Sequence, residues 1–162
     1  MKNKILEQEF ITLVKQYERV IYKVCTFYVS ETSPLEDLYQ EIVLNLWKEY
    51  PNFRKESQTS TWLYRIALNT CITDLRRNAK HRQNVSLELS EHIIFEQDTQ
   101  SVEIQELYSL IYKLNRIERS IILLWLEEKS YQEIADVTGF SVANVATRLK
   151  RTKEKLKNMS NQ

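Results

Sequence analysis

The stretch SYQEIADVTGFSVANVATRLKR, residues 130–151, decides the fold of the C-terminal part of this 162-residue chain. Ser130 with Glu133 three residues later has the spacing of a capping box, which begins a helix. Gly139, the only glycine of the chain, can take the left-handed conformation that ends this helix, and Ser141 can cap the next one. A short helix, a turn and a second helix rich in basic residues are expected of a helix-turn-helix, whose second helix lies in the major groove of DNA.

The helix expected after Ser141 has an inward and an outward face. Val142, Val145 and Leu149 share the inward face at helical spacing. The outward face holds the candidate DNA-contacting residues, which are Ser141, Asn144, Thr147, Arg148 and Arg151. Among them, Asn144 and Arg148 are the best candidates for reading base edges. The alternative is an ordinary pair of packed helices whose basic C-terminal end is only solvated.

The rest of the chain also predicts helices. It has one glycine and two prolines, and its apolar residues recur at intervals of three and four, so no segment is a credible strand. The expected helices span residues 9–28, 34–50 and 59–77, and two more follow residue 102 with a pause at Asn115. Ser33 is the expected cap of the second of these helices. The fold class is therefore all-α.

Charge divides the chain into basic, acidic and basic parts, although the net charge is only +1. One basic cluster lies at residues 76–82 and a second at 148–157, whereas acidic residues dominate 86–118. Helical periodicity fails between residues 83 and 98. We therefore expect two small helical domains, residues 1–83 and 100–162, joined by a flexible acidic linker at 84–99.

Composition excludes several classes of function. Phosphate-binding loops of the P-loop and Rossmann types need two or more glycines at fixed spacing, and this chain has one. His81 and His92 have no partners at metal-ligand or nucleophile spacing, so we expect no enzyme, no metal and no cofactor. Cys25 and Cys71 lie in apolar helical patterns, which favours buried free thiols over a disulfide. No stretch is apolar enough to span a membrane and the first residues do not form a signal peptide, so we expect a cytoplasmic protein.

Two further helix faces carry candidate binding residues. On the helix at 59–77, aromatic and cationic groups share one side, which suits unpaired DNA bases and phosphates; this side holds Tyr64, Arg65, Asn69, Thr73 and Arg76. On the helix at 34–50, a polar stripe comprises Asp37, Gln40, Glu41 and Asn45, and its acidity favours a protein partner over DNA. For both faces the alternative is a solvated surface with no partner.

Four ordered segments resemble those of the extracytoplasmic-function sigma factors, the minimal group of the sigma-70 family of bacterial RNA polymerase. The resemblance covers essentially the whole chain. The segments are EDLYQE at 36–41 with Leu44, Leu46 and Trp47; Phe53-Arg54 with TWLYRIALN at 61–69 and DLRR at 74–77; residues 114–124 with SYQEIA at 130–135; and residues 142–156.

This resemblance implies a role for each segment. The polar stripe Asp37, Gln40, Glu41 and Asn45 would bind the clamp helices of the polymerase beta-prime subunit. The −10 element would be recognised and melted by Tyr64, Arg65, Asn69, Arg76, Arg77, Asn78, Ala79 and Lys80. The −35 element would be bound by Ser141, Asn144, Thr147, Arg148 and Arg151. The resemblance also implies promoter-specific initiation by core polymerase, contact with its beta subunit, and control by an anti-sigma protein.

Departures from the family pattern limit what can be transferred. Asn115 stands where the family usually has proline, at a helix boundary. Asn144, Ala146 and Thr152 replace residues that are frequent at those positions of the recognition helix. The preferred −35 sequence therefore cannot be copied from relatives.

Two other classes of protein could use the same residues. A stand-alone helix-turn-helix regulator would bind duplex DNA without polymerase, and it predicts a dimer on a palindromic site. An interaction-only protein, such as an inhibitor, would carry its basic segments as plain surface and would lack salt-sensitive DNA binding.

Overall fold

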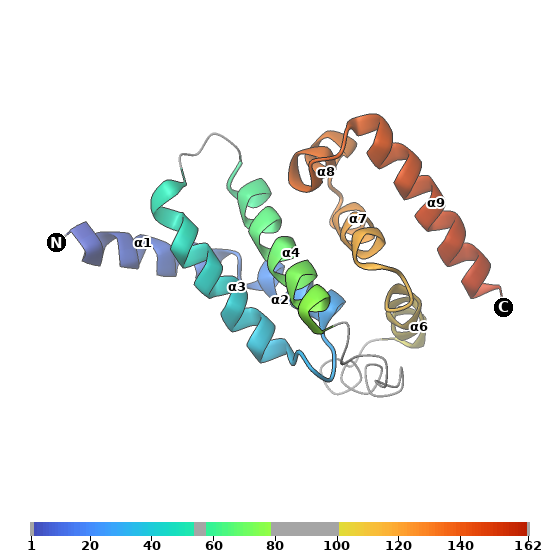
Figure 1. Ribbon diagram of the computed structural model, residues 1–162, viewed down its shortest axis with the longest axis horizontal. Helices are drawn as coiled ribbons and strands as arrows, with labels where there is room; N and C mark the ends of the chain where they lie inside the picture. The colour runs from blue at the N-terminus through green and yellow to red at the C-terminus, as the bar shows by residue number, and fades with distance from the viewer. Residues whose placement is uncertain (1, 54–57, 79–100, 162) are drawn as a thin grey trace.

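The computed structural model describes residues 2–53, 58–78 and 101–161, and these residues are helical with no strand among them (Figure 1). The helices are α1 (Lys2–Gln16), α2 (Glu18–Tyr28), α3 (Leu35–Glu49), a 3₁₀ turn (Tyr50–Asn52), α4 (Thr59–Asn78), α6 (Val102–Ile111), α7 (Arg116–Leu126), α8 (Tyr131–Thr138) and α9 (Val142–Ser160). The all-α prediction is confirmed. The linker expected at 84–99 lies outside the described residues, and the domain boundaries stay a prediction.

The first expected helix, 9–28, is wrong in its bounds, because the chain bends at Tyr17 and forms two helices. Tyr17 has φ −105° and ψ 16°, yet its amide still donates to the Leu13 carbonyl at 3.1 Å. The helical hydrogen bond of the Tyr17 amide is therefore kept at the bend. The bend directs α1 so that Phe10, the buried residue of that helix, packs against Trp47 of α3 with ring centroids 5.0 Å apart.

Ser33 does not cap α3 as expected. The residue before the helix is Pro34, which makes no side-chain cap. Ser33 is instead buried, and its hydroxyl donates a hydrogen bond to the Asp74 carboxylate of α4. This serine therefore joins the α2–α3 loop to α4.

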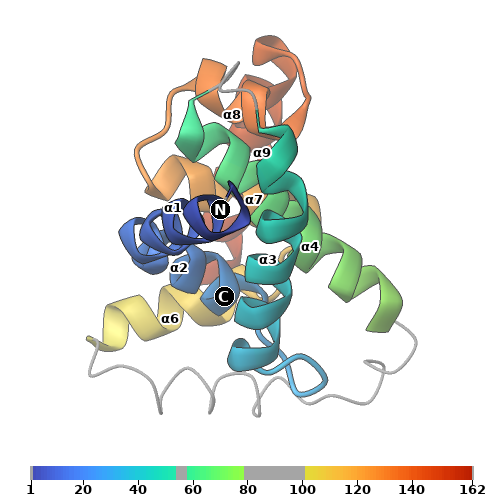
Figure 2. The ribbon, with the colours of Figure 1, turned by 90° about the vertical axis from the view of Figure 1, so that its left-hand side faces the viewer.

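The helices pack as two halves that share one continuous core. Helices α2, α3 and α4 pack together in the N-terminal half, and Figures 1 and 2 both show α3 and α4 side by side. In the C-terminal half, α7 and α8 pack on α9. Helix α4 also packs against α7 and α8, so it lies between α3 and the C-terminal half (Figure 1). The buried apolar residues of both halves form a single cluster.

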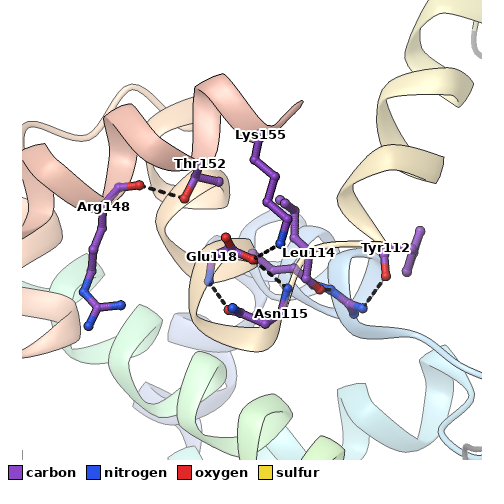
Figure 3. Close-up of polar contacts among 8 residues, drawn as sticks. Tyr112, Leu114, Asn115, Glu118, Arg148, Thr152 and Lys155 are labelled. Carbon is purple, nitrogen blue, oxygen red and sulfur yellow. Dashed lines mark hydrogen bonds and ion pairs between the residues drawn. The ribbon is translucent and has the colours of Figure 1, made fainter. Parts of the chain in front are cut away.

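A half-buried arginine joins the two halves. Arg119 of α7 donates from Nε to the Leu114 carbonyl at 3.0 Å and from Nη2 to the Tyr112 carbonyl at 2.7 Å (Figure 3). Its Nη1 crosses to the carbonyl of Phe27, at the end of α2, at 3.3 Å. Burial lowers the pKa of this guanidinium, which stays cationic at neutral pH because its ordinary pKa is so high. The arginine thus satisfies carbonyls at helix ends from both halves.

Two tyrosines complete the same junction. The Arg119 guanidinium lies 5.8 Å from the ring centroid of Tyr28 and 5.3 Å from that of Tyr112. The Tyr28 hydroxyl donates to the Arg116 carbonyl at 2.9 Å, and the Tyr112 hydroxyl donates to the Thr26 carbonyl. Each tyrosine therefore bonds to the backbone of the opposite half.

Both cysteines are buried and free, as the sequence predicted. Burial raises the pKa of the Cys25 thiol to about 12 and holds the pKa of Cys71 well above its ordinary value. Both side chains therefore stay protonated at neutral pH, where the reactive thiolate is scarce.

Replacing Arg119 by Met should destabilise the protein strongly, because the change leaves three buried carbonyls without their donor. We expect the free energy of unfolding to fall by about 3 kcal/mol in urea titrations. Lys113→Met, at an exposed position six residues earlier, should change it by less than about 0.5 kcal/mol. Equal losses in the two variants would contradict the role given to Arg119.

The two thiols should react with a maleimide or a disulfide reagent only when the protein unfolds. At pH 8 in native buffer both should be protected, and both should react within seconds in denaturant. Mass spectrometry of the labelled protein measures this directly. Rapid labelling of either cysteine in the native protein would show that its helix is not packed as described.

Candidate nucleic-acid and polymerase interfaces

The helix-turn-helix forms as the local sequence predicted. The Ser130 hydroxyl accepts the Glu133 amide and the Glu133 carboxylate accepts the Ser130 amide, both at 3.1 Å, so the capping box is complete. These hydrogen bonds to Ser130 lower the pKa of Glu133. Gly139 ends α8 with φ 83° and ψ 0°, and a Cβ built on it would meet no atom within 4 Å. The Ser141 hydroxyl then accepts the Asn144 amide at 3.1 Å and begins α9.

Helix α9 lies at the outer edge of the molecule with one face free of the core (Figure 1). The five residues expected on its outward face are all exposed: Ser141, Asn144, Thr147, Arg148 and Arg151. Val145 and Leu149 are buried as predicted, but the prediction for Val142 is wrong, since 40% of it is exposed. Val142 is the first residue of the helix, ahead of the turn that packs on the core.

Thr152, one of the departures from the family pattern, has a structural explanation. It is buried against the core, and its hydroxyl donates to the carbonyl of Arg148 at 2.7 Å (Figure 3). This internal bond satisfies the hydroxyl without a partner from another helix. Thr152 therefore belongs to the packing of α9 and not to its outward face.

Some of the basic residues at the end of α9 contact α7. Lys155 forms an ion pair with Glu118 at 3.0 Å (Figure 3). Lys153 lies 4.1 Å from the ring centroid of Trp125. Glu118 also accepts the amide of Asn115 at 3.0 Å, which closes a second capping box at the start of α7. Asn115 thus begins α7 with a side-chain cap, in the place where the family usually has proline.

Tyr64 and Arg65 of α4 lie against the C-terminal half. Tyr64 was expected on the exposed side of its helix, but it is only 2% exposed because α7 and α8 cover it. Its hydroxyl lies 3.4 Å from the Glu127 carboxylate, and the ammonium of Lys129 lies 5.5 Å from its ring centroid. Arg65 is exposed, yet its guanidinium donates to the Asp136 carbonyl of α8.

The remaining candidates on and after α4 are less covered or lie outside the described residues. Asn69 is exposed, as expected. Helix α4 continues to Asn78, but the side chains of Arg76, Arg77 and Asn78, and all of Ala79 and Lys80, fall outside the described residues.

The polar stripe on α3 divides into two parts. Asp37 and Gln40 are exposed, whereas Glu41 and Asn45 are half-buried beside α4. The Asn45 amide donates to the Thr70 hydroxyl of α4 at 2.9 Å. Glu41, Asn45 and Asn69 line one groove between the two helices, so the candidate polymerase-binding and DNA-binding surfaces adjoin there.

Two exposed apolar side chains next to this stripe were part of the matched segment but not among the four residues assigned to polymerase binding. Leu44 and Trp47 are 51% and 36% exposed, at the fourth and seventh positions after Gln40. Leu44 could have been found from its spacing, because it continues the polar stripe by one turn. Trp47 is both exposed and packed, because one side of its ring contacts Phe10 of the core.

The described residues show no group of three or more metal-ligating side chains, and none of the described helices is long and apolar enough to cross a membrane.

Comparisons with known proteins agree with the arrangement of the helices. The family model of sigma-70 region 2 matches residues 13–81, and that of sigma-70 region 4 matches residues 104–156. The RNA polymerase sigma factor YlaC of Bacillus subtilis is 30% identical over 87% of each chain. The ECF RNA polymerase sigma-E factor of Haemophilus influenzae is 29% identical over 94% of this chain and 87% of that protein.

Solved structures share the fold at lower identity. The sigma factor RpoE bound to the anti-sigma factor NepR, from Bartonella quintana, superposes with a TM-score of 0.74 at 18% identity over 95% of this chain and 98% of that chain. CnrH in complex with the cytosolic domain of CnrY gives 0.66 at 22% identity, over 96% of this chain and 89% of that one.

The contact between α4 and the C-terminal half should be sensitive to charge reversal at Glu127. This carboxylate pairs with Lys23 of α2 at 2.6 Å as well as lying beside Tyr64. In Glu127→Lys, two ammonium groups would meet, so we expect the halves to separate and the radius of gyration in small-angle X-ray scattering to rise. Glu128→Lys makes the same change of charge at an exposed neighbour and should leave the scattering unchanged. Identical curves for both variants would mean that Glu127 does not hold the halves together.

Proposed function

This chain belongs to the extracytoplasmic-function group of the sigma-70 family and directs promoter-specific transcription initiation by RNA polymerase, and we propose that its two halves divide that task. The observation that carries this proposal is the order of its parts. A region 2 match covers the half that contains α3 and α4, and a region 4 match covers the half that contains the helix-turn-helix. As a partner of polymerase and promoter DNA, the protein would act in the cytoplasm.

The outward face of α9 would bind the −35 element. Its five exposed residues present hydroxyl, amide and guanidinium groups, which can donate to base edges in the major groove and to phosphates. No ATP is needed for this binding, because affinity comes from these contacts and from the release of counterions.

Helix α4 and residues 76–80 would bind and open the −10 element. Unpaired bases stack on aromatic rings and the backbone pairs with cations, which is the combination that Tyr64, Arg65 and the basic cluster supply. Because α7 and α8 cover Tyr64 in the closed arrangement, this role requires the two halves to separate when the protein binds polymerase and DNA.

The exposed surface of α3 would bind the clamp helices of the beta-prime subunit. Asp37 and Gln40 supply the polar contacts, and Leu44 and Trp47 add exposed apolar area one and two turns further along the helix. Apolar and aromatic groups surrounded by polar ones are the usual composition of a protein interface. Asn45, which is bonded to Thr70, would act by holding α3 against α4.

The C-terminal half would also contact the beta subunit, and an anti-sigma protein would control access to both halves. The two solved relatives were each obtained with an anti-sigma factor or with the cytosolic domain of a partner protein. The chain itself would need no catalytic residue, because the polymerase performs nucleotidyl transfer.

The test is transcription from a promoter library by purified core polymerase with and without this protein. We expect initiation from a shared two-part promoter only when the protein is present. The variant Asp37→Arg/Gln40→Ala should abolish initiation, because it reverses a charge and removes an amide at the docking surface. Glu31→Arg, an exposed change in the α2–α3 loop, serves as the matched control and should be active.

One outcome would contradict this function, and another would contradict only the docking surface assigned to α3. DNA binding with no redirection of polymerase would favour a stand-alone regulator. Full activity of the Asp37→Arg/Gln40→Ala variant would preserve the sigma function but remove α3 as its docking surface.

A further inference from the structure

We propose that Phe140 and Asn144 are positioning residues that hold the Arg148 guanidinium in place for a pair of acceptor atoms on the −35 DNA. This inference rests on the proposed role of α9 and goes beyond it, because it names the residues that set the orientation of one contact. Phe140 lies in the turn and was not among the candidate site residues. Asn144 was expected to read bases itself.

Phe140 provides a fixed surface beside the recognition helix. It directly follows Gly139, whose φ of 83° sets the direction of the chain, and its amide donates to the Thr138 hydroxyl at 3.4 Å. Its ring is half-buried and packs against the core cluster. A ring held from both the backbone and the core has little freedom to turn.

The Arg148 guanidinium contacts this ring through its face. Its central carbon lies 4.4 Å from the Phe140 ring centroid, the distance of a close cation–π contact. A cation held over the face of a ring is confined on that side. Phe140 therefore limits the positions that the guanidinium can take.

Asn144 restricts the rotation of the guanidinium by a hydrogen bond to one of its edges. Its side-chain oxygen accepts the Arg148 Nε–H at 3.1 Å, from one helical turn earlier. The backbone of Asn144 is itself held by the cap from Ser141 at 3.1 Å. Of the five N–H donors of an arginine, this bond uses the one on Nε and leaves the paired terminal groups for an outside partner.

The partner that fits the two terminal NH₂ groups of Arg148 is a pair of neighbouring acceptor atoms. Two phosphate oxygens provide such a pair, and so do O6 and N7 of a guanine. Arg148 borders a cavity together with Arg116 and Arg119, so the surroundings favour a partner of negative potential. In Figure 3, the Arg148 side chain extends away from α9, whereas Asn115 and Glu118 lie at the start of α7.

The hydrogen bond has a readout in the free protein that does not depend on DNA. In nitrogen-15 NMR spectra, the Arg148 Nε–H proton should exchange with water more slowly in the wild type than in Asn144→Ala. Equal exchange rates in the two proteins would overturn the role of Asn144, whether or not the chain is a sigma factor.

The effect on DNA binding is measured with the protein bound to core polymerase, on duplex probes that carry the selected promoter. Phe140→Leu keeps an apolar side chain but removes the ring face, and it should weaken binding about 3-fold, while Phe140→Tyr should restore wild-type affinity. In an Arg148→Ala background the same Phe140→Leu change should have almost no effect, because the group that it positions is gone. Equal losses in both backgrounds would show that Phe140 serves only the packing of the turn and would overturn the proposal.

Arg148→Ala itself distinguishes the two sources of the acceptor pair. Loss of affinity for probes with one particular guanine, and not for probes with that base changed, indicates base recognition. A uniform loss of affinity on every probe indicates backbone recognition. In that case the slope of log affinity against log salt concentration should also fall by about one. No loss on any probe would overturn the proposal, and no promoter binding by the wild-type complex would instead overturn the function on which it rests.

Discussion

The arrangement of the two halves depends on one half-buried cation, Arg119, which binds carbonyls at the ends of α6 and α2 and one in the α6–α7 loop. Arg119 has no carboxylate among the hydrogen-bond partners described for it; carbonyl oxygens of Tyr112, Leu114 and Phe27 share its charge instead. Carbonyl groups at helix ends carry partial negative charge and lack partners within their own helix, so a guanidinium suits them better than a neutral donor would. With the halves joined in this way, α4 packs against α7 and α8. The covered position of Tyr64 is therefore a consequence of how α7 is fastened to α2.

Local signals in the sequence were sufficient for the helix-turn-helix, and they were insufficient wherever distant segments meet. Ser130, Gly139 and Ser141 act on residues within four positions of themselves, so their effects could be predicted from spacing. Tyr64 depends on α7 and α8, which are more than fifty residues away, and helical periodicity contains no information about them. Ser33 was misassigned for the same reason, because its partner Asp74 lies on another helix. Arg119 lies in the matched segment 114–124, but no role was predicted for its side chain, which makes the central contact.

Helices α3 and α4 carry two different candidate surfaces, one for polymerase and one for DNA, and the two helices are packed together. They lie side by side, and the Asn45–Thr70 hydrogen bond joins them across the groove that both candidate surfaces border. A partner that binds the exposed side of α3 therefore places α4 at a defined position relative to itself. The sequence predicted both faces separately but could not show that they adjoin, because the two stripes lie on helices separated by the segment around residues 50–58.

The turn between α8 and α9 requires glycine because of its backbone conformation and not because of a lack of space. Nothing lies within 4 Å of the place where a side chain of Gly139 would begin, so a methyl group would fit there. The obstacle is the backbone angle, since φ of 83° is unfavourable for an L-amino acid. The mirror-image residue D-alanine has no such backbone penalty. In a chemically assembled chain, we expect D-alanine at this position to keep the backbone angle, and with it the angle between α8 and α9, at a lower cost than L-alanine.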